Sequence, residues 1–220
     1  MQNEETAAPG VETSAETPAT PTRKRPKPGE RRVQILQALA AMLEQPGAER
    51  ITTAALAARL EVSEAALYRH FASKAQMFEG LIEFIEQTVF TLVNQIAERE
   101  GAAEAGAGTR HAGKVVTMLV QFAEKNPGMT RVMVGDALVF ENERLQQRMN
   151  QFFDKIEATL RQGLRDGGMA NAASATPSVD AQVQASVLTS FVMGRLQRYA
   201  RSGFKRLPSE HLEASLALIL

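Results

Sequence analysis

The stretch Ile51–Phe71, ITTAALAARLEVSEAALYRHF, decides the fold of this chain. Thr52 and Thr53 are good N-cap residues, and they predict a short helix of about eight residues. After a three-residue turn, Ser63 caps a second helix that is predicted to end at Phe71. Two short helices at this spacing form a helix-turn-helix, whose second helix reads base edges in the major groove of DNA.

Apolar side chains recur three and four residues apart on both sides of this motif, which indicates helices. Further helices are predicted over residues 33–43, 73–96, 114–125, 129–140, 141–165, 183–199 and 212–219, the longest of which (141–165) has a seam like that of a short coiled coil. No window alternates like a strand. The chain is therefore predicted to be all-α, with about nine helices. A three-helix domain over residues 29–76 is expected to precede a helical dimerisation and partner-binding domain over residues 77–220.

Charge is distributed unevenly along a chain whose 25 basic and 25 acidic side chains balance. Residues 1–22 hold four glutamates and no Lys or Arg, whereas residues 23–76 hold ten basic and five acidic side chains. Residues 1–28 also hold five of the nine prolines, so we expect a disordered tail. Its basic end is either a solubilising linker or an arm that gains order on a phosphate backbone. The basic segment indicates a polyanionic partner.

Several classes of protein are excluded by composition. The chain has no Cys, no apolar run of about 18 residues and no signal-like N-terminus, so we expect a soluble, cytoplasmic protein. His70, His111 and His211 are isolated from one another, so neither a metal nor another cofactor is expected. Phosphate-loop, dinucleotide-binding and nucleophile-elbow motifs are absent, so the chain is not expected to be an enzyme.

The segment Leu67–Phe78, LYRHFASKAQMF, resembles the end of the TetR-type DNA-binding domain, in which a Ser-Lys step opens the long fourth helix. One departure is Glu61, where the family usually carries Gly; a positive φ there would cost about 1 kcal/mol. From the spacing and the resemblance together, the residues expected to contact DNA are Thr52, Thr53, Ser63, Ala65, Tyr68, Arg69, His70, Ser73 and Lys74. The two-fold symmetry of such proteins implies palindromic sites.

Matches outside this domain resemble the nucleoid-occlusion branch of the TetR family. They include LIEFIE at 81–86 and NPGMTR at 126–131. The resemblance implies a nucleoid-associated homodimer, with two dimers on one DNA site, that binds the C-terminal tail of the division GTPase FtsZ and disrupts its polymers. The implied groove residues are Phe84, Met118, Lys125 and Asn126. Leu92 stands where the branch carries a basic residue, which puts one contact with that partner in doubt.

The last two predicted helices are expected to form the dimer bundle. The interface residues predicted there are Leu188, Phe191, Gly194, Leu196, Leu212 and Leu216. Two other functions stay open. A TetR-type repressor released by a small molecule would need polar groups in an apolar pocket, for which Thr117 and Gln121 are candidates. A purely architectural DNA binder would need no partner for the C-terminal body.

Overall fold

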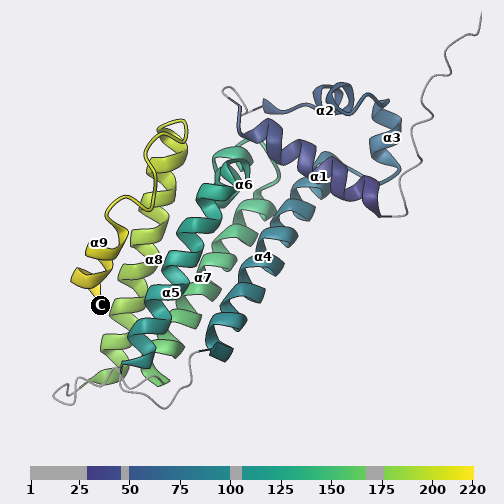
Figure 1. Ribbon diagram of the computed structural model, residues 1–220. Helices are drawn as coiled ribbons and strands as arrows, with labels where there is room; N and C mark the ends of the chain where they lie inside the picture. Colours follow the sequence, from purple (N-terminus) through teal and green to yellow (C-terminus); the bar gives the residue numbers. More distant parts are fainter. Residues whose placement is uncertain (1–28, 46–49, 100–105, 167–175) are drawn as a thin grey trace, which may run out of the picture.

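The computed structural model describes residues 29–45, 50–99, 106–166 and 176–220. Every regular element within these ranges is a helix, so the predicted all-α class is confirmed (Figure 1). The predicted disordered tail, with its basic end, lies outside the described residues, as do residues 46–49, 100–105 and 167–175. Among the helices described, none combines the length and apolar character that a membrane span requires.

Three short helices form a head at one end of the molecule: α1 (Glu30–Leu43), α2 (Thr53–Arg59) and α3 (Glu64–Tyr68). Their small core is made of side chains from each helix and from the segment that follows. The buried members are Ile35, Leu39, Leu43, Leu56, Leu67 and Phe71. Figure 1 shows α1 running beneath α2 and α3, which leaves both of these helices on the outside of the head.

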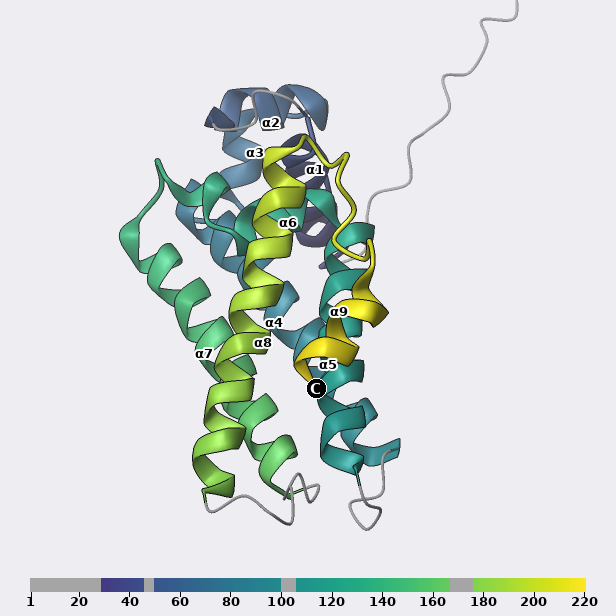
Figure 2. The same ribbon diagram turned by 90° about the vertical axis from the view of Figure 1, so that its left-hand side faces the viewer.

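Four long helices run side by side beneath the head: α4 (Lys74–Arg99), α5 (Ala107–Lys125), α7 (Glu143–Asp166) and α8 (Pro177–Arg201) (Figure 2). The remaining elements are α6 (Pro127–Met133), a 3-10 turn η2 (Asp136–Leu138) and α9 (Leu212–Ile219). Together, α4 to α9 are called the bundle here. Because α4 begins at Lys74, the domain boundary predicted at residue 76 lies in its first turn.

The seam predicted for the helix over 141–165 is the centre of the bundle core. Its apolar positions on α7 are all buried within this chain, where α7 packs on α5 and α8. Phe152 makes edge-to-face contacts with Phe90 of α4 at 5.7 Å and with Phe153 at 5.1 Å between ring centroids. This apolar stripe therefore holds the protomer together.

Several helix limits differ from the predicted ones, and three of these differences have a clear physical reason. The second helix of the motif ends at Tyr68 instead of Phe71, because residues 69–71 form a turn that buries the Phe71 ring. Helix α5 begins at Ala107, well before Lys114, since its Gly and Ala residues lie against the core. The helix predicted over 129–140 is divided by Gly135, whose φ of +85° ends α6 before η2.

Helix α1 attaches the head to the bundle. Its Leu36 side chain packs over Gly80 of α4, where an added Cβ would lie 3.1 Å from the Leu36 Cδ2. Near its other end, the carbonyl group of Ala40 lies against Gly128 of α6 so closely that a Cβ there would be 2.0 Å from the oxygen. The glycines at these two positions allow α1 to lie directly on the bundle.

Candidate nucleic-acid interface

The two helices of the motif are capped as the sequence predicts. The Ala55 amide donates to the Thr52 hydroxyl at 3.1 Å, and the Ala66 amide donates to the Ser63 hydroxyl at 3.3 Å. Both cap residues have extended backbone and lie exposed on the surface of the head. Their hydroxyl groups therefore set where α2 and α3 begin, and these helix starts are available to an approaching phosphate.

The turn between the two helices carries the positive φ that was expected at Glu61. Its φ is +54°, in the left-handed region that glycine adopts more easily. The Val62 amide donates to the Ala57 carbonyl at 3.0 Å, which closes the turn. Ala57 is itself buried, and its small side chain lets α2 and α3 pack closely. The turn therefore keeps its geometry with Glu in place of Gly.

The outward side of α3 presents the side chains that were predicted to face away from the core. Ala65, Tyr68, Arg69 and His70 are all exposed, with 46% of Tyr68 accessible. The Tyr68 hydroxyl donates to the Thr53 hydroxyl at 3.5 Å, and Thr53 in turn donates to the Glu64 carboxylate. This chain of contacts joins the start of α2 to both ends of α3, so the outward side is ordered without DNA.

Arg32 of α1 supports this face from within the head. Its guanidinium lies 4.1 Å above the Phe71 ring and donates to the His70 carbonyl at 3.0 Å. These two contacts fix the turn that follows α3, and with it His70. Nothing in the sequence around Arg32 indicates this contact, because His70 lies 38 positions further along the chain.

Lys74 is engaged in a way that the sequence did not indicate. Ser73 caps α4 as predicted, because its hydroxyl accepts from the Gln76 amide at 3.2 Å. The ammonium group of Lys74, however, pairs with the Glu141 carboxylate, which reaches it from the connection between η2 and α7. Lys74 is 30% exposed and Glu141 only 10%. The cation expected to meet a DNA phosphate is thus already neutralised by the bundle.

The four residues assigned to a partner groove lie on two helices that pack against each other, α4 and α5. Phe84 belongs to α4, Met118 and Lys125 belong to α5, and Asn126 follows the last residue of α5. Phe84 is 47% exposed on α4, and Lys125 is exposed at the end of α5. Met118 is half-buried and shares the face of Lys125, two turns away. Asn126 donates to the Phe122 carbonyl at 2.7 Å, so part of its amide is used to end α5.

The predicted dimer interface needs correction. Leu188, Leu196, Leu212 and Leu216 are buried in the core of their own protomer, so a second copy cannot reach them. Of the six residues named, only Gly194 is exposed, and Phe191 lies half-buried beneath the Arg195 guanidinium at 4.5 Å. The exposed apolar side chains of α8 and α9 are a different set, namely Val179, Val183, Val187, Met193 and Leu218.

Thr117 and Gln121, the polar groups proposed for a small-molecule pocket, do not line either of the two hollows found among the described residues. Gln121 is exposed, and the Thr117 hydroxyl donates to the Gly113 carbonyl of its own helix at 2.8 Å. Two surface hollows of about 240 and 440 Å³ are lined mainly by charged and polar side chains, the first between α8 and α9 and the second between α4 and α7. In the described ranges, no three His, Asp or Glu side chains gather as metal ligands would.

Comparisons with known proteins agree with this architecture. The family described as bacterial regulatory proteins of the tetR family matches residues 35–81, and the SlmA-like family, described as a tetracyclin repressor-like C-terminal domain, matches residues 109–220. FadR of Bacillus subtilis, solved in complex with stearoyl-CoA, shares the fold at a TM-score of 0.66 and 14% identity, over 85% of this chain and 96% of that one. PfmR of Thermus thermophilus shares it at a TM-score of 0.63 and 21% identity, over 85% and 94%.

Full-length relatives are much more similar. Nucleoid occlusion factor SlmA of Idiomarina loihiensis is 51% identical over 84% of this chain and 90% of that protein. The SlmA of Vibrio cholerae is 49% identical over 86% and 93%. Factors and regulators of this kind bind DNA as dimers and catalyse no reaction. The helix-turn-helix, the helical bundle and this identity across both place the chain in the TetR family of DNA-binding proteins, in the group of nucleoid occlusion factor SlmA.

Proposed function

We propose that this protein is a nucleoid occlusion factor. As a dimer it binds palindromic chromosomal sites through α3, and in that state it binds the C-terminal tail of FtsZ and disrupts FtsZ polymers over the nucleoid. The observation that carries the proposal is the identity of about 50% to SlmA proteins across the bundle as well as the head. The bundle is where a ligand-released repressor and a division inhibitor would differ.

The reading of DNA rests on the ordered, exposed face of α3. Tyr68 and Ala65 are exposed on α3 and offer apolar and hydroxyl contacts to base edges. Arg69 and His70 follow the end of α3 and are exposed to meet the phosphate backbone of the DNA. Thr52, Thr53 and Ser63 lie at helix starts, where amide groups and hydroxyls favour phosphate. Ser73 and Lys74 would add a further phosphate contact once Lys74 leaves Glu141.

The partner site rests on Phe84. An exposed phenyl ring on a charged helix surface is the kind of anchor that concentrates binding energy. Lys125, exposed at the C-terminal end of α5, supplies a positive charge for an acidic peptide. The side-chain oxygen Oδ1 of Asn126 can accept from the peptide backbone, while its side-chain nitrogen Nδ2 donates to the Phe122 carbonyl. Leu92 contributes only apolar surface to this flank.

The dimer would form through the outward side of α8. Val179, Val183 and Val187 are each more than 40% exposed and lie one turn apart along the helix. Gly194 continues the same face, and an added Cβ there would meet no atom within 4 Å in this protomer. A small residue on an apolar helix face allows a second helix to approach closely. Two such dimers on one DNA site remain part of the proposal.

Titration of a labelled FtsZ tail peptide, with a selected palindromic duplex present, tests this function. We expect Phe84→Ala to weaken peptide binding by about 2 kcal/mol, or roughly 30-fold, while DNA affinity is unchanged. Phe140→Ala is the matched control, because Phe140 is also an exposed phenyl ring (59%) but lies on the connection before α7. It should bind the peptide as the parent does.

Two results would count against the proposal. If the parent binds the duplex but no peptide, and a small molecule releases the duplex, the protein is a ligand-controlled repressor. If the parent binds the duplex, binds no peptide and is not released from the duplex by a small molecule, the protein has an architectural role instead of inhibiting division. Equal loss in the Phe84 and Phe140 variants would move the peptide site away from α4 and α5.

A further inference from the structure

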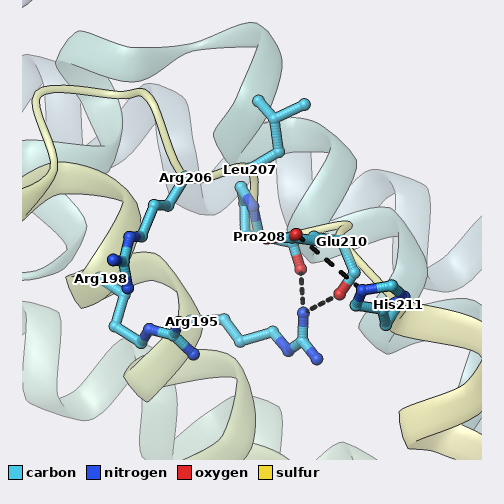
Figure 3. Close-up of a pocket in the computed structure, with 7 residues that line it drawn as sticks. All are labelled: Arg195, Arg198, Arg206, Leu207, Pro208, Glu210 and His211. Atoms are coloured by element: carbon cyan, nitrogen blue, oxygen red, sulfur yellow. Dashed lines mark hydrogen bonds and ion pairs between the residues drawn. The ribbon is translucent and has the colours of Figure 1, made fainter.

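A basic hollow of about 240 Å³ lies where α8 passes into α9 (Figure 3). It is lined by Arg195, Arg198, Arg206, Leu207, Pro208, Glu210 and His211. Both views of the molecule place this connection at the end of the bundle that carries the head (Figures 1 and 2). The hollow shares no lining residue with the α3 face or with the proposed peptide site, and the proposed function does not use it.

Arg195 builds the wall of this hollow. Its guanidinium donates to the Pro208 carbonyl at 3.0 Å, to the Glu210 carbonyl and to the Ser215 hydroxyl at 2.8 Å. These bonds tie the connection and the first turn of α9 to α8. Since its donors are occupied in this way, Arg195 is a positioning residue that holds the hollow open in one shape.

Arg198 and Arg206 have a different role. Both are exposed and line the same side of the hollow, and within the part of the chain that the structure describes neither pairs with a carboxylate (Figure 3). The one carboxylate of the lining, Glu210, lies 3.9 Å from the His211 ring nitrogen. Three guanidinium groups therefore surround the hollow against a single acid, and an anion placed there would relieve their mutual repulsion.

We propose that this hollow is a phosphate-binding site. Two free guanidinium groups present planar pairs of donors, which match the oxygens of a phosphate. The volume lies below the roughly 300–1,000 Å³ typical of sites for drug-sized ligands, which favours a single phosphoryl group over a larger molecule. The phosphate comes either from the backbone of the duplex bound by the head or from a free phosphate compound. This assignment goes beyond the proposed function.

The DNA source is tested by measuring duplex affinity against salt concentration. Each phosphate neutralised contributes about 0.9 to the salt slope, so a dimer with two occupied hollows should lose roughly two units in the double variant Arg198→Ala/Arg206→Ala. Arg99→Ala removes an exposed cation at the far end of α4 and should leave the slope unchanged. Sedimentation of the variant as a parent-like species shows that the fold and the dimer survive.

The free source is tested by titrating pyrophosphate into the DNA-free protein with calorimetry. Binding by the parent that falls at least tenfold in the double variant supports a site for a free phosphate compound. Arg198→Lys/Arg206→Lys keeps the charge but not the planar donors, and it should recover less than half of that loss. If the double variant matches the parent in both salt slope and pyrophosphate binding, the hollow is not a phosphate site.

Discussion

The substitution Gly128→Ala tests whether the head is held to the bundle as the structure indicates. Gly128 lies in the first turn of α6, and a Cβ built there would stand 2.0 Å from the Ala40 oxygen and 2.9 Å from its carbonyl carbon. Both are backbone atoms of α1, so no side chain can rotate away to make room. The added methyl group therefore has to push α1 and α6 apart.

The size of the effect follows from these distances. Real Cβ atoms keep about 3.0 Å or more from other heavy atoms, so the two helices must separate by about 1 Å. Because the clash is with backbone atoms, the cost lies in the upper part of the overpacking range, about 2–3 kcal/mol, and the better helix propensity of Ala returns about 1 kcal/mol. The net loss of about 1–2 kcal/mol corresponds to a melting temperature lower by roughly 2–8 °C.

Thermal unfolding and duplex binding are the two measurements. Because α1 carries α2 and α3, its displacement should also weaken the binding of a palindrome that needs both heads at a fixed separation. Gly113→Ala is the matched control, since a Cβ in this part of α5 would meet only Leu220 Cδ1 at an ordinary 3.5 Å. A Gly128→Ala protein that melts at or above the parent temperature and binds DNA equally would refute this account of the junction.

Three further changes have defined outcomes. Glu61→Gly should raise the free energy of unfolding in urea by up to about 1 kcal/mol, because the φ of +54° is no longer strained; a loss instead would contradict strain in the turn. Glu141→Gln should free Lys74 and tighten duplex binding by about two- to fivefold in an anisotropy titration, and unchanged affinity would show that Lys74 stays away from DNA. Burial and then the charge of Glu124 raise the pKa of Tyr199, so the folded chain keeps the phenol protonated where the unfolded chain begins to ionise, near pH 10. Stability should therefore fall as pH rises above about 10, and urea titrations at several pH values should show a smaller fall for Tyr199→Phe.

The motif was predictable because its signals are local. Thr52 and Ser63 were recognisable as caps from their residue type and position. In the structure each hydroxyl accepts a hydrogen bond from the backbone amide three residues later, as a cap does. The positive φ of Glu61 was suggested by the resemblance to the TetR family, whose turn usually carries Gly at this position. The end of α3 was less predictable, since Phe71 continues the apolar pattern of the helix although it packs after a turn.

Contacts between distant segments carried no such signal. The Lys74–Glu141 pair joins residues 67 positions apart, and each residue has an ordinary local role as a helix-start neighbour. Similarly, the close approach of Ala40 and Gly128 depends on how α1 crosses α6, which neither helix sequence specifies. In the sequence, Gly128 belongs to a run that ends the preceding helix and resembles the family, and the structure supplies the physical reason for a glycine at that position.

Helix α8 shows why the dimer face was misassigned. Two apolar rows run along it, each with the spacing of a helix: Ala181, Ala185, Leu188, Val192 and Leu196 are buried, and Val179, Val183 and Val187 are exposed. Periodicity identifies a face that avoids water, but it does not state which neighbour covers that face. Two leucines of the buried row, Leu188 and Leu196, were predicted to lie in the dimer interface, whereas α5 and α7 of the same chain already cover that row. The row of valines is the one that stays exposed to solvent in the protomer. An exposed apolar row of this kind is typical of an interface, which is the argument for a dimer formed through it.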